Sequence, residues 1–239
     1  MCRTTQPGGL PSTWPTTPKP EHQTLSSVPT DALSQSAYQH AVQNLHPAIL
    51  NHSIRVYLLA HALASRSSSP WINADRLPLL FAACVLHDIG TCGLHNGSQR
   101  FEVEGADAAA SIVTYHGFNE ADAHDVWVAI AVHASPGIAE RISPLACLVR
   151  VAVLRDFKAT IPASAGQWAV DLGDEMKTVM REGEERFPRL GIEKVLGDAV
   201  VEQALQVGTS EKAPAGSWPG NLMRAHKENP DWEGANKAF

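Results

Sequence analysis

Two histidines and two aspartates lie on the apolar faces of segments with helical spacing: His52, His87, Asp88 and Asp156. On a helix, residues three, four and seven positions apart share a face, and apolar residues stand at such distances from His52, His87 and Asp156. We therefore expect these side chains to point into the core. An unpaired buried carboxylate costs several kcal/mol or takes up a proton, so each of the two aspartates requires a cation or a strong hydrogen-bond donor nearby. One divalent metal ion would meet this requirement for all four residues.

His133 is a fifth polar residue on an apolar face, because valine, alanine and isoleucine stand seven, four and three positions before it. Each of these residues, taken alone, also has an ordinary structural explanation. A buried histidine is usually hydrogen-bonded within the core, and Asp88 stands where it can cap a turn before Ile89. Asp156 has three arginines with which to pair, namely Arg55, Arg150 and Arg155. The coincidence of such residues on separate segments favours a shared cause, which is a metal site.

The elements that must position these side chains are helices. Apolar residues recur with helical periodicity at residues 33–45, 47–67, 75–87, 103–116, 120–134, 144–158, 174–184 and 192–206. Helix-start signals stand before three of these segments, at Asn73-Ala74-Asp75, Asn119-Glu120 and Ser143-Pro144. Alternating β-branched stretches bounded by turns are missing. The fold class is therefore predicted to be all-α, as a bundle of helices.

Composition divides the chain into three parts. Residues 1–30 hold six prolines and few large apolar groups, so they cannot bury enough surface to offset the entropy lost on ordering, and we expect an irregular N-terminal arm. Residues 31–207 carry the helical pattern and form the predicted metal-binding domain. Residues 208–239 are rich in Gly, Pro, Trp and Lys, and we expect an irregular C-terminal extension on the surface.

Charge and cysteine content narrow the class of function. The chain has 25 acidic and 19 basic residues, a net charge of −6 and no dense Lys/Arg run, which argues against a nucleic-acid partner and favours a small-molecule substrate. Four cysteines without CxxC spacing argue against disulfides and against a thiolate zinc site. No apolar run reaches the roughly 20 residues of a membrane helix, and no signal peptide is visible. We expect a cytoplasmic homo-oligomer without a membrane partner.

A histidine on an early helix, the doublet His87-Asp88 and a distant helical Asp156 together resemble the H…HD…D metal set of the HD-domain superfamily. The flanking sequence is similar to the cyanamide hydratase branch of that superfamily over residues 45–190. The segments that carry this similarity are Asn51-His52-Ser53-Ile54-Arg55-Val56, Leu86-His87-Asp88-Ile89-Gly90-Thr91, Phe101-Glu102-Val103, Ala129-Ile130-Ala131-Val132-His133, Leu154-Arg155-Asp156 and Phe187-Pro188-Arg189. Two segments depart from that branch: Thr91 to Phe101 is shorter, and Phe157-Lys158-Ala159 replaces a Gly-containing continuation.

The resemblance implies an HD-type helical bundle and an enzyme that adds water to a cyano group, as in the conversion of cyanamide to urea. The metal ligands it implies are His52, His87, Asp88 and Asp156. Two imidazoles and two carboxylates suit Zn²⁺, Fe²⁺ or Mn²⁺, and the resemblance favours one Zn²⁺. Hydration of a nitrile also needs a proton at nitrogen, and His133 beside the metal is the expected donor.

Other candidate residues have more than one interpretation. Thr91 or Ser53 is expected to orient water or substrate. His95, in the loop after Thr91, either lines the mouth of a pocket or is an ordinary surface residue. Glu102 or Glu104 stands where HD proteins with two metals supply an extra histidine, which favours a single metal. Glu102 is either a partner of a ligand or a structural acid at a helix start.

Two other functions compete with nitrile hydration. One is phosphohydrolysis of a nucleotide or phosphate ester, which HD proteins commonly catalyse. A phosphate site requires several cations around the metal, and only four basic residues are near in sequence, namely Arg55, Arg100, Arg155 and Lys158. The other is a binding module in which a metal only holds the helices together.

Overall fold

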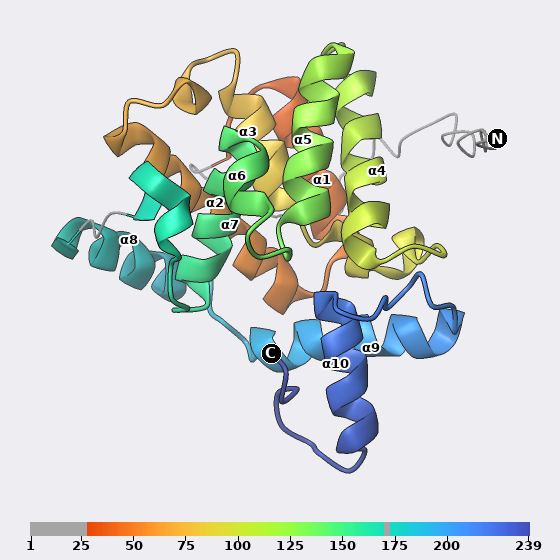
Figure 1. Cartoon of the computed structure of the whole chain (residues 1–239). Helices are drawn as coiled ribbons and strands as arrows, with labels where there is room; N and C mark the ends of the chain where they lie inside the picture. Colours follow the sequence, from red (N-terminus) through yellow and green to blue (C-terminus); the bar gives the residue numbers. More distant parts are fainter. Residues whose placement is uncertain (1–27, 170–172) are drawn as a thin grey trace.

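The computed structural model describes residues 28–169 and 173–239, and within these ranges every regular element is a helix. Figure 1 shows the arrangement. The α-helices are α1 (Ala32–Asn44), α2 (Pro47–Arg66), α3 (Leu77–Val85), α4 (Phe101–Tyr115), α5 (Glu120–Val132), α6 (Ala139–Ile142), α7 (Pro144–Asp156), α8 (Gly173–Arg186), α9 (Ile192–Val207) and α10 (Trp218–Glu228). Short 3-10 helices span Pro70–Ile72 (η1), Ile89–Thr91 (η2), Gly93–His95 (η3) and Ala163–Ala169 (η4). The predicted all-α fold is confirmed for the described residues.

Helix α2 is the central helix of the bundle, because it packs against α3, α7, α8 and α9. Helix α5 closes the bundle on another side through contacts with α4, α3 and α7. The fully buried side chains between these helices are almost all apolar, as the periodicity predicted. The largest apolar ones are Leu33, Leu59, Leu79, Leu80, Phe81, Leu86, Ile112, Ile130 and Leu145. This apolar core surrounds the polar residues of the candidate site.

Two predicted helix starts are confirmed by their capping contacts. The Asn119 side chain accepts a hydrogen bond from the backbone N–H of Asp122 at 2.9 Å, and the Ser143 hydroxyl accepts one from Ala146 at 3.1 Å. Each contact satisfies an N–H group that lacks a partner within its helix. The third predicted start, at Asn73, is wrong. There the chain makes a turn after η1, and α3 begins only at Leu77.

Helix α3 also ends two residues before its predicted end, at Val85. His87 and Asp88 therefore lie in the turn between α3 and η2, rather than on a helical face. Gly90 brings this turn onto α4, because a Cβ atom at Gly90 would lie 1.9 Å from the carbonyl oxygen of Phe101. Only glycine permits so close a backbone approach. The two polar residues are consequently held by packing against α4 as well as by α3.

The predictions for the two ends of the chain have different outcomes. Residues 1–27 of the predicted N-terminal arm lie outside the described residues. The C-terminal extension, predicted to be irregular from residue 208, contains helix α10, which begins with Ser217 as N-cap and Pro219 in its first turn. Figure 1 shows α10 beside α9, with residues 229–239 returning toward the bundle. No helix in the described part of the chain is long and apolar enough to span a membrane.

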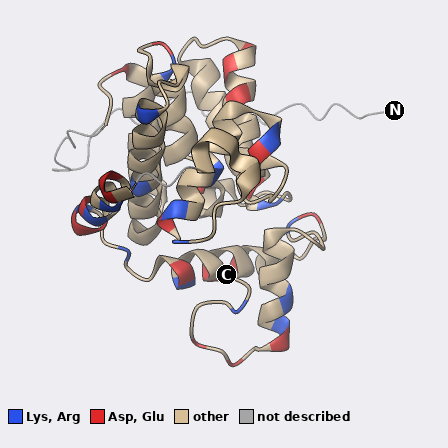
Figure 2. Cartoon of the chain, turned by 60° about the vertical axis from the view of Figure 1, so that its left-hand side comes forward, with Lys and Arg blue, Asp and Glu red and all other residues tan. Residues whose placement is uncertain are grey.

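Helix α8 is the most polar helix on the outside of the bundle. Acidic and basic residues lie close together along it in Figure 2, and pairs such as Lys177–Asp174 and Arg181–Glu185 join neighbouring turns. Its buried positions are Met176 and Gly183. At Gly183 the Arg55 side chain of α2 approaches to 3.6 Å of a Cβ position. Helix α8 thereby covers Arg55, whose role follows below.

Candidate metal centre

Three buried side chains from two separate segments present donor atoms to a common point. His52 lies in the middle of α2, and His87 and Asp88 lie in the turn after α3. One donor atom from each of these residues lies within 4.8 Å of the others, and all three residues are buried. We call His52, His87 and Asp88 the donor group. It unites three of the four predicted metal ligands.

The two imidazoles of the donor group point their Nε2 atoms toward each other. His52 Nε2 lies 3.2 Å from His87 Nε2, and His87 Nε2 lies 3.2 Å from Asp88 Oδ2. His133 approaches the group from the other side, with its Nε2 atom 3.5 Å from Asp88 Oδ1. The ring of His133 also meets that of His87 edge-on at 4.9 Å. Four polar residues therefore share one small volume inside an apolar bundle.

The Nδ1 atoms of His87 and His133 are held by the helices that precede them. His87 Nδ1 donates to the Cys84 carbonyl at 2.7 Å, and His133 Nδ1 donates to the Ile130 carbonyl at 2.7 Å. The last four carbonyls of a helix have no partner within it, so both histidines cap a helix C-terminus. Because a carbonyl can only accept, the proton of each neutral ring is on Nδ1. Nε2 is then left as a lone-pair donor.

His52 lies within a helix, and its Nδ1–H group donates a hydrogen bond to Asp156 instead of to a helix carbonyl. His52 Nδ1 donates to Asp156 Oδ2 at 2.7 Å. Arg55 donates to the same carboxylate through Nε at 2.7 Å and through Nη2 at 2.8 Å. Asp156 was predicted as a metal ligand, but the structure places its carboxylate beside Nδ1 of His52, outside the donor group. The alternative interpretation, in which Asp156 pairs with Arg55, is confirmed.

A second arginine completes the surroundings of Asp156. Arg189 Nη1 donates to the Asp156 carbonyl at 2.8 Å and lies 3.6 Å from Oδ2. Arg55 is itself almost fully buried and also donates to the Phe187 carbonyl at 2.7 Å. Sequence reasoning assigned no role to Arg189, and it treated Arg55 as one of three partners for Asp156 and as one of four basic residues near the metal. The spacing of Arg55, three residues after His52 on the same helical face, was the available signal.

Burial opposes ionisation of both aspartates, but their neighbours outweigh it. The imidazoles of His87 and His133 hold the pKa of Asp88 well below its ordinary value. Arg55 and His52 likewise lower the pKa of Asp156. Burial lowers the pKa of His52. It works in the same direction on His87, but there Asp88 outweighs it and raises the pKa above the ordinary value. Both aspartates are therefore anionic near neutral pH.

The donor group has the properties that a divalent cation requires. Both carboxylate oxygens of Asp88 are buried and accept no hydrogen bond, which is costly unless a cation lies near them. The Nε2 lone pairs of His52 and His87 face each other at 3.2 Å, and they repel unless a proton or a metal ion lies near both. Imidazole and carboxylate donors suit Zn²⁺, Fe²⁺ and Mn²⁺. The residues therefore fit one divalent metal ion held by the donor group.

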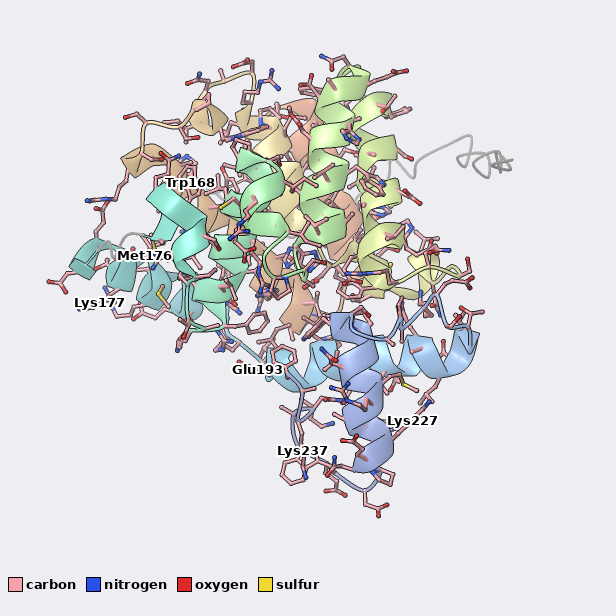
Figure 3. All side chains as sticks on the ribbon, in the orientation of Figure 1. Trp168, Met176, Lys177, Glu193, Lys227 and Lys237 are labelled. Atoms are coloured by element: carbon pink, nitrogen blue, oxygen red, sulfur yellow. The ribbon has the colours of Figure 1, made fainter. Side chains whose placement is uncertain are left out.

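A cavity of about 380 Å³ opens on the donor group and on His133. Most of its remaining wall is apolar, and the larger side chains in it are Val153, Leu154, Phe157, Leu196, Trp218 and Phe239. Two charged residues among the described ones join this wall, Arg150 and Glu193. Figure 3 labels Glu193 at the start of α9, below the bundle. Trp218 and Phe239 belong to the C-terminal extension, for which sequence reasoning predicted only a surface position.

The other predicted site residues lie away from this cavity. The hydroxyl of Ser53 donates to the Ile49 carbonyl of its own helix at 3.0 Å. Thr91 donates to the Asp88 carbonyl at 2.7 Å and so supports the turn that carries Asp88. The described lining of the cavity includes neither residue. Their expected role in orienting water or substrate therefore has no geometric support.

His95 and the two glutamates also have structural partners. His95 Nε2 lies 2.8 Å from Nε2 of His40 on α1, so it does not line the mouth of the cavity. Glu102 is buried in the first turn of α4 and pairs with Arg100 at 2.6 Å. Glu104 accepts a hydrogen bond from the Gln99 backbone N–H at 2.8 Å. Of the two interpretations of Glu102, the structural acid at a helix start agrees with these contacts.

A comparison with protein families agrees with this geometry. Residues 49–152 match the model of the HD domain family, and this segment contains the whole donor group and His133. The match covers less than half of the chain and supports the predicted resemblance to the HD-domain superfamily, which comprises metal-dependent hydrolases and phosphohydrolases. No curated protein matches the chain. The finer similarity to cyanamide hydratases stays a prediction.

Proposed function

We propose that this protein adds water to the cyano group of a small molecule, with one divalent metal ion, Zn²⁺ by preference, held by His52, His87 and Asp88. The observation that carries the proposal is the pairing of this donor group with a cavity whose wall is largely apolar. When bound, a divalent cation supplies Lewis-acid chemistry and lowers the pKa of water from 15.7 to about 7. The sequence similarity to cyanamide hydratases supports the same reaction.

His133 is the residue that we propose for proton transfer. With its Nδ1 proton held by the Ile130 carbonyl, a neutral His133 presents an unprotonated Nε2 to the cavity and accepts a proton there first. Nε2 takes one proton from water as the water oxygen bonds to the cyano carbon. One carbon–nitrogen π bond breaks in the same step and leaves its electron pair on the cyano nitrogen, to which the imidazolium then returns the proton. The second water proton leaves oxygen when the imidic acid rearranges to the amide.

Asp88 supports this proton transfer through its negative charge. Its Oδ1 atom lies 3.5 Å from His133 Nε2, so the anionic carboxylate stabilises the imidazolium between the two proton transfers. General acid–base catalysis of this kind contributes about 10²–10⁴-fold to a rate. His133 and Asp88 are therefore the catalytic residues of the proposal. Ser53 and Thr91 have no place in it.

The alternative reaction, phosphoester hydrolysis, is supported by the superfamily match. A phosphate group carries negative charge and needs cations beside the metal, most often arginine or lysine. Among the described residues of the cavity wall, Arg150 is the one arginine or lysine. It already donates to the His133 carbonyl at 3.0 Å and lies 3.5 Å from Glu140. Glu193 in the same wall pairs with Arg189 and offers a phosphate no positive charge, so the lining favours the neutral cyano group.

The test measures metal content, urea release from cyanamide and phosphate release from a panel of nucleotides on one preparation. We expect one Zn²⁺ per chain and urea, without phosphate. The informative variant is His133→Asn, because the Asn amide retains the hydrogen bond to the Ile130 carbonyl but lacks a group equivalent to Nε2. The rate should fall by about 10²–10⁴-fold with metal content unchanged. Phosphate release without urea refutes the proposal.

The matched control is His116→Asn. His116 also follows the C-terminus of its helix, α4, but it does not line the cavity. We expect its rate and metal content to equal those of the unaltered protein. A loss of metal from His133→Asn alone would instead assign His133 as a metal ligand. Proton transfer would then have to come from another group.

A further inference from the structure

Three aromatic rings form a continuous wall over the candidate metal centre. Phe157 lies 4.5 Å from the His52 ring, centre to centre. Phe239 meets Phe157 edge-on at 5.0 Å and Trp218 at 5.5 Å. These distances lie within the range of favourable aromatic contacts, about 4.5–7 Å. The wall, defined as Phe157, Trp218 and Phe239, therefore extends from the donor group to the C-terminal extension.

The C-terminal extension is held in place by contacts outside the wall. Lys212 is buried and donates to the Gly97 carbonyl at 3.1 Å, and Thr209 donates to the Ser98 carbonyl at 3.2 Å. Trp218 also meets Phe101 of α4 at 5.9 Å. These contacts fix the start of the extension against the loop before α4. The aromatic wall is thus a defined part of the cavity.

The size of the cavity exceeds what cyanamide needs. Water occupies about 30 Å³ per molecule in the liquid, so a cavity of about 380 Å³ has room for roughly a dozen non-hydrogen atoms. Cyanamide has three. Its amino group would also gain nothing from rings, because an aromatic wall stabilises apolar surface and excludes water. The volume and the lining both favour a larger, apolar substrate.

The charged residues that line the cavity outside the donor group, Arg150 and Glu193, do not alter this conclusion, because each has a partner. Arg150 donates to the His133 carbonyl and lies near Glu140. Glu193 accepts a hydrogen bond from Arg189. Neither side chain needs a charged substrate group to balance it. A neutral molecule is therefore the better occupant of the cavity.

We infer that the substrate is a nitrile whose non-reacting part is an apolar group of about the size of a benzene ring, held against Trp218 and Phe239 while its cyano carbon faces the donor group. This inference rests on the proposed function and names its substrate class. Trp218 and Phe239 are specificity residues in this scheme. They touch the substrate body and take no part in proton transfer.

The experiment uses para-fluorobenzonitrile as the probe and fluorine NMR to measure its binding to the full chain, with and without Zn²⁺. Hydration of the probe and of cyanamide is measured in parallel. Trp218→Ala and Phe239→Ala should each weaken probe binding about three- to tenfold, as expected for the loss of one aromatic contact. Each should raise KM for the probe by a larger factor than KM for cyanamide, which has no ring to contact the aromatic wall.

The matched control is Trp232→Ala, because Trp232 is an exposed tryptophan of the same extension that does not line the cavity. It should leave probe binding unchanged. If Trp218→Ala loses helical content by circular dichroism, Phe239→Ala decides the question, since Phe239 is 36% exposed and lies outside the helices.

The outcomes separate this inference from the proposed function. Probe binding that weakens in both variants, without hydration of any nitrile, supports the aromatic wall and contradicts the proposed function. Urea from cyanamide together with equal probe affinity in all variants supports the proposed function and overturns the inference. Preference for cyanamide over the probe in kcat/KM also overturns it.

Discussion

Replacement of Asp156 by Asn tests whether Asp156 binds the metal ion itself or positions the ligand His52. In the structure Asp156 accepts hydrogen bonds from His52 Nδ1 and, through two nitrogens, from Arg55. Asn has the same shape but no charge, and it can present one oxygen only. The variant therefore leaves the buried Arg55 guanidinium without its counter-charge, and it weakens the contact that fixes the ring of His52.

The structure sets the expected size of both effects. Removal of one partner from a buried ion pair costs about 3–5 kcal/mol, and Arg55 is only 2% exposed. For a chain of this length each kcal/mol lowers Tm by about 2–4 °C, so Asp156→Asn should lower Tm by about 6–20 °C. Loss of a residue that orients a metal-binding histidine lowers metal affinity by about 10–100-fold. Direct loss of a ligand would cost more.

The assay is Zn²⁺ titration of the metal-free protein with a competing chelator, together with thermal unfolding. Arg55→Met serves as the companion variant, because it breaks the same ion pair but leaves Asp156 bonded to His52. Both variants should lower Tm, and Asp156→Asn, which also weakens the contact with His52, should reduce Zn²⁺ affinity by a larger factor than Arg55→Met. Asp231→Asn, an exposed aspartate, is the control and should match the unaltered protein. If Asp156→Asn abolishes Zn²⁺ binding while Arg55→Met leaves it intact, Asp156 is a ligand and the reasoning fails.

Three other perturbations test the site and its support. Asp88 raises the pKa of His87 against the effect of burial. Protons therefore compete with the metal ion for His87 below this raised pKa, and in a chelator titration Zn²⁺ affinity should fall there by about tenfold per pH unit. A Zn²⁺ affinity that does not change from pH 7 to pH 5 contradicts this. Gly90→Ala places a Cβ atom 1.9 Å from the Phe101 carbonyl oxygen and should cost about 3 kcal/mol or more by denaturant unfolding, whereas Gly93→Ala, with open space around it, should cost less than about 1 kcal/mol. Ser143→Ala removes the N-cap of α7 and should cost about 0.5–2 kcal/mol; no change in unfolding free energy would show that the cap is replaced by water.

Most of the helical framework could be predicted from periodicity alone. Long helices such as α2 and α7 have apolar residues at helical spacing and, at α7, a capping serine followed by proline, so their bounds agree with the prediction to within a residue or two. The shorter helix α3 was misjudged at both ends, because its apolar run continues beyond the point where the chain turns. Helix α10 was missed, since it has few apolar residues, and these pack against α9 and against Phe101 of α4.

The sequence predicted which residues belong to the candidate site better than it predicted their roles. His52, His87, Asp88, His133 and Asp156 are all buried, as predicted, although His87 and Asp88 lie in a turn rather than on a helical face. Which ring nitrogen faces the centre depends instead on a hydrogen-bond partner elsewhere in the fold. For Asp156 the deciding contact spans 101 residues. The aromatic wall could not be predicted, because two of its rings come from a segment whose composition indicated only irregular surface structure.

The contrast between the three histidines explains why this centre needs Asp156 at all. A histidine that follows a helix finds a carbonyl of the last helical turn that can accept its Nδ1 proton, as His87 and His133 do. Within a helix every carbonyl already accepts from the helix itself, so His52 must take its acceptor from another element. A carboxylate in that place brings a negative charge into the core, and a buried arginine must then balance it. Arg55, one turn from His52 on α2, provides this balance, so the same helix supplies both the histidine that we propose as a metal ligand and the cation that keeps its partner anionic.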